Sequence, residues 1–230
     1  MLTRILVAIG ALVAIAPAAA AQGPDCDPAR YYFILFGGQG IPFRARTAHT
    51  WAVYAKATPL VTGQTAVEAF TISWLPAVGD VQPLRVRPVQ GRNYTLAETL
   101  QIMADHSAQI SYWGPYEIDG PRYALAAEQY RFLTSGYPVY RAIDSFNLNT
   151  KTVNCVHAVT HASAVTSKYI QPVIRVGEPG TSRLAKLYLR GGAWQKYPET
   201  ADWLIPVLGL DTYPRLVKRE PGERIPRRFQ

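Results

Sequence analysis

Strand-forming segments come first in this 230-residue sequence, and the clearest helix-forming segments lie in its middle. Three β-prone runs, at 31–36, 49–58 and 67–75, are separated by turn-forming residues. The first run ends at a glycine-rich segment, 37–40, that we expect to be an ordinary turn, because it lacks the Lys-Ser/Thr ending of a phosphate-binding loop.

The helical signals are sharpest in the middle of the chain. Thr95 and Glu98 have the spacing of a capping box, which predicts a helix over 96–106. Asp119 stands as a cap before Pro121, and the helix that follows ends at Gly136. We expect further segments as follows: a strand containing a turn at 109–118, a short strand at 137–143, a polar loop at 144–152, an alanine-rich helix from 153–155, and helices at 181–189 and 200–209.

The N-terminal segment, 1–21, has the pattern of a cleaved secretory signal peptide. A basic start is followed by about a dozen apolar residues and then by Ala19, Ala20 and Ala21, so we expect cleavage before Gln22. The apolar stretch is too short to span a bilayer, and no later segment is long and apolar enough to be a transmembrane anchor. The sequence therefore predicts a secreted or periplasmic protein.

The remaining residues fit a single domain, expected at 22–214, followed by a basic tail at 215–230. The formal net charge is +8 at pH 7. This excess favours anionic partners, such as an envelope polymer, a lipid or an acidic peptide. Nucleic acid is disfavoured, because no helix-turn-helix, zinc-finger or RNA-binding signature is present. The sequence does not indicate an oligomeric state.

Cys155 and His49 form the one arrangement with clear chemical content. Cys155 opens a predicted helix, where free backbone N–H groups and the helix dipole favour a thiolate. His49 stands on an early strand and can act as a base and proton donor. Together the two residues supply the minimum for a cysteine nucleophile.

Residues 154–159, Asn-Cys-Val-His-Ala-Val, resemble the Asn-Cys-Glu-His-Phe-Val signature of the lecithin:retinol acyltransferase group, which belongs to the circularly permuted, NlpC-type papain-like enzymes. The resemblance implies an α+β fold in which a small antiparallel sheet packs against helices. It also implies a catalytic histidine on a strand that precedes the cysteine in sequence, as His49 does. Such enzymes hydrolyse or transfer acyl groups of amides or esters through a thioester, without a cofactor. The sequence departs from the group at Val156, Ala158 and Val61, the last of these where a second polar residue is common.

Supporting roles are expected for residues near this pair. The backbone amide of Cys155, assisted by Asn154, would bind the oxyanion. Thr71 and Ser73, on the following strand, are candidates for orienting His49.

Two other interpretations remain open. An exported protein with two cysteines can form a Cys26–Cys155 disulfide, which would leave a non-catalytic envelope-binding module that uses its basic tail and aromatic residues. His157 and His161 have a spacing suited to a metal, but the Glu of the H-E-x-x-H pattern is absent, so we expect structural histidines and no metal.

Overall fold

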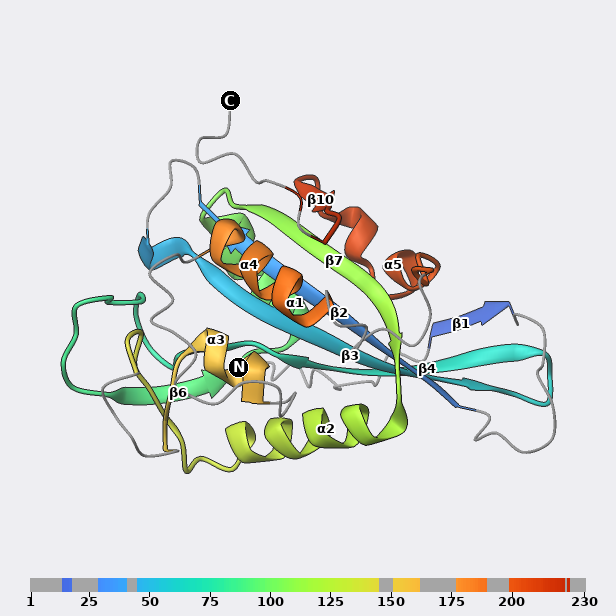
Figure 1. Ribbon diagram of the computed structural model, residues 1–230, viewed down its shortest axis with the longest axis horizontal. Helices are drawn as coiled ribbons and strands as arrows, with labels where there is room; N and C mark the ends of the chain where they lie inside the picture. The colour runs from blue at the N-terminus through green and yellow to red at the C-terminus, as the bar shows by residue number, and fades with distance from the viewer. Residues whose placement is uncertain are drawn as a thin grey trace, which may run out of the picture.

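The computed structural model describes residues 14–17, 29–40, 45–144, 151–161, 177–189, 199–221 and 223. It confirms the α+β class: helices pack against a long, twisted sheet, with a smaller sheet at one end (Figure 1).

The main sheet has six strands in the order β1-β4-β3-β2-β7-β10. Neighbouring strands run antiparallel except for β10, which is parallel to β7. Their bounds are Ala14–Pro17 (β1), Arg30–Gln39 (β2), His49–Pro59 (β3), Gln64–Ile72 (β4), Gln109–Ile118 (β7) and Leu216–Lys218 (β10).

The smaller sheet has four short strands in the order β5-β6-β8-β9. They span Trp74–Pro76 (β5), Val89–Asn93 (β6), Val139–Tyr140 (β8) and Thr152–Val153 (β9). Strand β9 leads directly to Cys155, so this sheet fixes where the cysteine-bearing helix begins.

The helices are α1 (Leu96–Asp105), α2 (Gly120–Thr134), α3 (Cys155–His161), α4 (Glu178–Leu189) and the short α5 (Leu204–Val207), with 3₁₀ turns at Ala45–Thr47 and Leu210–Thr212. The predicted caps are confirmed. Thr95 and Glu98 form a reciprocal capping box, and the Asp119 side chain accepts a hydrogen bond from the backbone N–H of Arg122.

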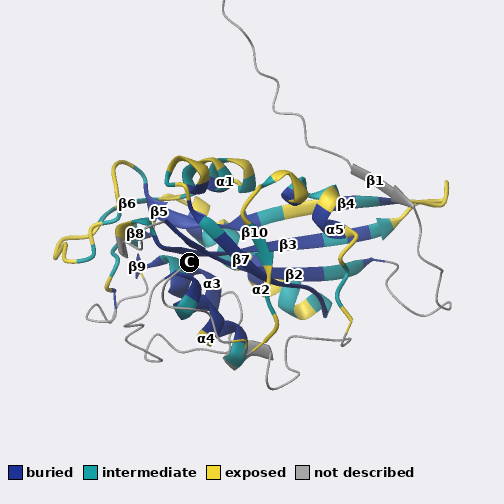
Figure 2. Ribbon diagram, turned by 90° about the horizontal axis from the view of Figure 1, so that it is seen from above, coloured by how far each residue is buried: buried dark blue, intermediate teal, exposed yellow. Residues whose placement is uncertain are grey.

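The two faces of the main sheet carry different helices. On β3, Trp51 and Val53 pack in the cluster that includes Met103 of α1, whereas Ala52 and Tyr54 pack in the cluster formed with α2, α3 and α4. Figure 2 shows α1 on one side of the sheet and α3 and α4 on the other. Because side chains alternate along a strand, His49 belongs to the α1 side and Thr50 to the α3 and α4 side.

The expected turn at 37–40 is wrong, because β2 continues through Gly37 and Gly38. A Cβ atom on Gly37 would lie 2.7 Å from Cβ of Thr181, and one on Gly38 would lie 2.5 Å from Sδ of Met103. These glycines therefore permit a close approach of α4 and α1 to the sheet.

Two other segments differ from expectation. Residues 109–118 form a single strand, β7, and the expected turn is instead a bulge at Gly114 and Pro115, where the pairing with β2 shifts register. The segment expected to be a basic tail begins with strand β10, because the edge of β7 is free to pair with Leu216–Lys218.

Strand β1 lies within the segment that we expect to be removed as a signal peptide, and it pairs with β4. Cleavage before Gln22 stays a prediction. In the described part of the chain, no helix is long and apolar enough to cross a membrane.

Candidate functional site

Cys155 is the first residue of α3, and it lies beside the part of β3 that is not paired with β4. Strand β3 begins at His49, but its pairing with β4 begins only at Ala52, which lies opposite Ile72. Thr50 therefore has no partner on β4. The backbone N–H of Thr50 instead interacts with the Cys155 sulfur. The structure thus brings the start of the His49 strand and the start of the Cys155 helix to the same place.

The Cys155 thiol is free and neutral. Burial raises its pKa to about 11, the nearby Asp144 carboxylate adds to the rise, and the amides of Thr50, Val156 and Cys155 oppose it. Part of the Cys155 residue is still exposed to solvent, but the thiol is closely surrounded by protein. Cys26 lies outside the described residues, so the disulfide stays a prediction.

His49 is 1% exposed, and its ring stacks against Trp51 at 5.3 Å. Its Nε2 lies 2.9 Å from Oγ of Ser73, the predicted orienting residue, which is the single residue between β4 and β5. Its Nδ1 has no hydrogen-bond partner among the described residues. Burial lowers the pKa of His49 to about 3, so the imidazole is neutral at physiological pH.

The Cys155 sulfur contacts the backbone N–H of Thr50, the residue after His49. Within the described residues, it does not contact the His49 side chain through a hydrogen bond. The ring of His49 lies on the α1 side, and α3 packs on the opposite side, with the sulfur against the Thr50 amide. Their pairing in catalysis stays a prediction.

A buried polar network holds the start of α3. Asp144 is fully buried; it accepts hydrogen bonds from the backbone N–H of Asn154 at 2.8 Å and from Nδ2 of Asn154 at 2.9 Å. Oδ1 of Asn154 in turn accepts from the backbone N–H of His157 at 2.7 Å, which caps the helix. Cys155 is held between these fixed residues.

The structure assigns Asn154 a different role from the expected one. Its Nδ2 group donates to Asp144 and, at 3.3 Å, to the Ala142 carbonyl, so both amide protons are engaged. Asn154 is thus a helix cap, and oxyanion binding would fall to backbone N–H groups. Thr71, the other orienting candidate, contributes its carbonyl to Nδ2 of Asn93.

His157 belongs to the same network, and the absence of a metal site stays a prediction. Nδ1 of His157 contacts Asp144, and no group of three or more potential metal ligands occurs in the described part of the chain. The side chain of His161 lies outside the described residues.

Asp144, Thr99 and Tyr140 lie at the site, and the sequence did not predict a catalytic or orienting role for any of them. Asp144 was expected only to begin a polar loop, ten positions before Asn154. Thr99 is buried in α1 and contacts Ser73, and the Tyr140 phenol is buried near Cys155 and Asp144. Nothing in the local sequence distinguishes these residues, because their partners are distant in the chain.

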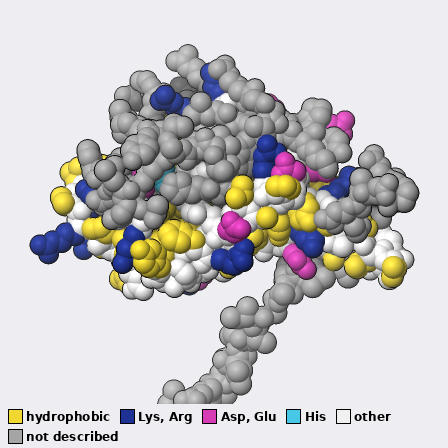
Figure 3. Space-filling model, turned by 60° about the horizontal axis from the view of Figure 1, so that its bottom comes forward, with side chains coloured by type: hydrophobic (Ala, Val, Ile, Leu, Met, Phe, Trp, Pro, Cys, Tyr) yellow, Lys and Arg dark blue, Asp and Glu magenta, His cyan; other side chains and the backbone are white. Residues whose placement is uncertain are grey.

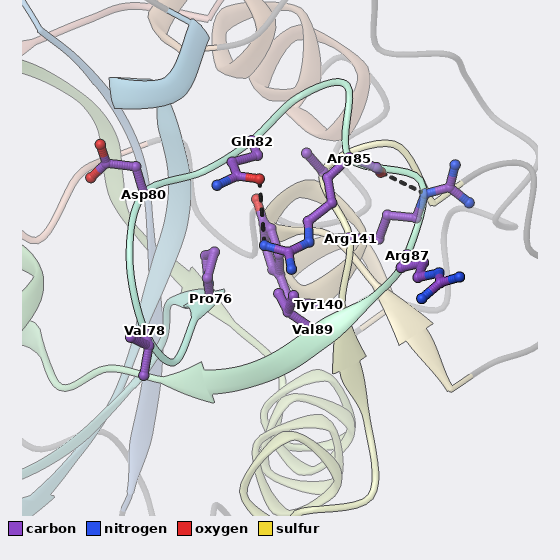
Figure 4. Close-up of a pocket in the computed structure, with 10 residues that line it drawn as sticks. Pro76, Val78, Asp80, Gln82, Arg85, Arg87, Val89, Tyr140 and Arg141 are labelled. Atoms are coloured by element: carbon purple, nitrogen blue, oxygen red, sulfur yellow. Dashed lines mark hydrogen bonds between the residues drawn. The ribbon is translucent and has the colours of Figure 1, made fainter.

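A cavity of about 370 Å³ adjoins His49 on the α1 side. The described residues that line it are Arg46, Thr47, Ala48, His49, Leu75, Pro76, Gly79, Asp80, Val81, Tyr94, Ile102, Met103, Asp105 and His106. A second hollow, at the β5–β6 connection, has a volume of only about 10 Å³. There Arg85 donates to Gln82 and Arg141 donates to the Arg85 carbonyl (Figure 4). This second hollow is too small for anything larger than a water molecule.

The basic residues of the expected tail are largely engaged where the structure describes them. Lys218 pairs with Asp202 at 2.7 Å, and Arg219 pairs with Glu223 at 2.7 Å. On the face seen in Figure 3, basic, acidic and hydrophobic side chains are interspersed. These observations give no specific support to an anionic-polymer site.

No family model, curated protein or solved structure matches this chain. The resemblance at residues 154–159 therefore stays a prediction.

Proposed function

We propose that this protein is an exported cysteine acyl hydrolase or acyltransferase with the permuted papain-like arrangement. Cys155 is its nucleophile, and His49 is its base. The observation that carries the proposal is the interaction of the Cys155 sulfur with the Thr50 amide, one residue from His49. Thr50 and Cys155 are more than a hundred positions apart in the sequence, and they meet at the part of β3 that is not paired with β4.

His49 is uncharged, as a base must be, but burial makes it a weak base in the resting structure, so the proposed mechanism requires its pKa to rise when substrate binds. Its pKa of about 3 leaves the imidazole neutral, Nε2 is occupied by Ser73, and Nδ1 is unpartnered among the described residues. In the proposed reaction the thiol proton passes to Nδ1 while the sulfur attacks the acyl carbon. The proton then passes to the departing amine or alcohol, which leaves a thioester. Water or a second acceptor cleaves the thioester and releases the enzyme.

Two features of the resting site shape this mechanism. Because the thiol is neutral, proton transfer must accompany the attack instead of preceding it. Because no hydrogen bond joins the two side chains, the sulfur and Nδ1 must approach each other when substrate binds, as catalytic hydrogen bonds often tighten only in that complex.

Acylation by p-nitrophenyl acetate tests the proposal. We expect a burst of p-nitrophenolate and an acetyl group on Cys155, located by peptide mass mapping and removed by hydroxylamine. Cys155→Ala should abolish both signals, whereas Cys26→Ala, the matched control, should retain them. His49→Ala should lose the burst while its circular dichroism spectrum shows that it is still folded. A folded wild-type protein that is acetylated no faster than Cys155→Ala would overturn the proposal.

A further inference from the structure

We infer that the β5–β6 connection, residues 77–88, docks on the surface of a lipid bilayer that contains anionic phospholipids. Its aliphatic side chains enter the apolar region of the bilayer, and the arginines beside them contact lipid phosphates. The inference does not rest on the chemistry proposed for Cys155.

The β5–β6 connection exposes aliphatic side chains at one end of the molecule. Val78 and Leu84 are each 90% exposed, and Val86 is 73% exposed. Figure 2 shows the exposed backbone of this region beside β6, at one end of the sheet. Single exposed aliphatic residues are ordinary on a protein surface, but here three lie in one short connection. Such a group marks a surface that contacts an apolar partner.

The backbone of the β5–β6 connection holds these side chains in solvent. Pro83 fixes a φ angle just before Leu84. The backbone N–H of Arg85 donates to the Gln82 carbonyl at 3.1 Å, which closes a turn around both residues. The aliphatic side chains are thus presented before a partner binds, so that docking costs little ordering of the chain.

The arginines of this region have no carboxylate partner. Among the residues that the structure describes, Arg85, Arg87 and Arg141 form no ion pair. The hydrogen bonds of Arg85 and Arg141 go to neutral oxygens, the Gln82 side chain and the Arg85 carbonyl. Asp80, the acidic residue of the connection, lies on the opposite arm with its carboxylate directed away from the arginines (Figure 4). The positive charge is therefore available to an anionic partner.

The combination of these features favours a bilayer over a soluble polymer or a peptide. A polyanion would use the arginines and leave Leu84 and Val86 in water. The hollow lined by Arg85 and Arg87 has a volume of only about 10 Å³, so the connection offers no groove for the side chains of a peptide. Projecting aliphatic side chains next to cations suit the boundary between acyl chains and phosphates, which long arginine side chains can reach.

Vesicle sedimentation with the full chain tests this inference. We expect binding to vesicles of phosphatidylcholine and phosphatidylglycerol to be at least about tenfold tighter than binding to phosphatidylcholine alone. Leu84→Gln and Arg87→Gln should each weaken binding to the anionic vesicles by about fivefold or more, through loss of inserted apolar area and of one charge.

Two matched controls alter exposed residues elsewhere. Val61→Gln changes an aliphatic residue in the β3–β4 turn, at the other end of the sheet (Figure 1), and Arg183→Gln changes an exposed arginine of α4. Both should bind like wild type. Any binding by the apolar N-terminal segment is common to all variants, so the differences between them report on the β5–β6 connection.

Insertion has a direct readout in tryptophan fluorescence. Bromine-labelled lipid should quench the added tryptophan of Leu84→Trp and leave that of Val61→Trp unquenched. Wild-type affinity in Leu84→Gln with a loss confined to Arg87→Gln would indicate a polyanion-binding surface and overturn the inference. Equal quenching of the two tryptophans, or no binding by the folded wild type, would also overturn it. Because these measurements read binding alone, their failure is distinct from a failure of the acylation test.

Discussion

Nδ1 of His157 lies 2.7 Å from each carboxylate oxygen of Asp144. Both residues are buried, and Asn154 links them through its side chain and backbone. This contact joins the segment that follows β8 to the first turn of α3. Because Asn154 and His157 are both held by this network, the contact fixes the position of Cys155 between them.

Removal of the Asp144 carboxylate should therefore destabilise the fold. Asp144→Ala leaves the Asn154 backbone N–H, the Asn154 amide and the His157 ring without their acceptor in a buried site. We expect the free energy of unfolding to fall by about 3–5 kcal/mol, measured by urea denaturation. Asp211→Ala, at an exposed carboxylate, should change it by less than about 0.5 kcal/mol. Similar losses in the two variants would contradict the structural role of Asp144.

Ionisation of Cys155 should weaken the fold at alkaline pH. Burial raises the pKa of the thiol from 9.0 to about 11 in the folded protein, so between these values the folded state holds a proton that the unfolded state has lost. This contribution is complete below pH 9 and is lost as the pH rises toward 11, with a limiting slope of about 1.4 kcal/mol per pH unit. Denaturation curves from pH 8 to 11 should show the loss in wild type and in Cys26→Ala, and a smaller loss in Cys155→Ala. An identical alkaline profile for Cys155→Ala would show that the thiol ionises normally.

Protonation of His49 should weaken the fold at acidic pH. Burial lowers its pKa from 6.5 to about 3, so between these values the unfolded chain binds a proton that the folded protein does not. The free energy of unfolding should therefore decrease as the pH falls from 6.5 toward 3, by at most about 1.4 kcal/mol per unit from this group. His49→Gln should show a shallower acid dependence than wild type, whereas His106→Gln should not. Parallel acid profiles for wild type and His49→Gln would contradict this prediction.

Gly37 should not tolerate a side chain. In Gly37→Ala the new methyl group would lie 2.7 Å from Thr181, which hydrogen-bonds to Thr50 at 2.7 Å, and 3.2 Å from Cα of Glu178. We expect a loss of about 1–3 kcal/mol from overpacking between β2 and α4, measured by thermal or urea denaturation. Gly120→Ala is the control, because its nearest neighbour, a ring carbon of Tyr31, lies at an ordinary 3.4 Å. Equal stability of the two variants would mean that α4 does not pack closely on Gly37.

Local sequence patterns predicted the helix starts well. The capping box at Thr95 and Glu98 and the cap at Asp119 depend on residues three positions apart, so a short window contains all the information. Gly37 and Gly38 were misread for the complementary reason. Their function is to admit Thr181 and Met103, which are remote in the sequence, and a glycine that permits close packing looks the same as one that makes a turn.

By itself, the sequence determined the α+β class, the strand that begins at His49 and the helix that begins at Cys155, because short-range propensity and capping encode these features. Only the tertiary structure decided how they meet. The end of β4 at Ile72 leaves the Thr50 amide open to the Cys155 sulfur, while alternation along β3 directs the His49 ring toward Ser73 and α1. Asp144 acquired its role in the same way, since strand order and burial depend on contacts between distant segments that no local pattern records.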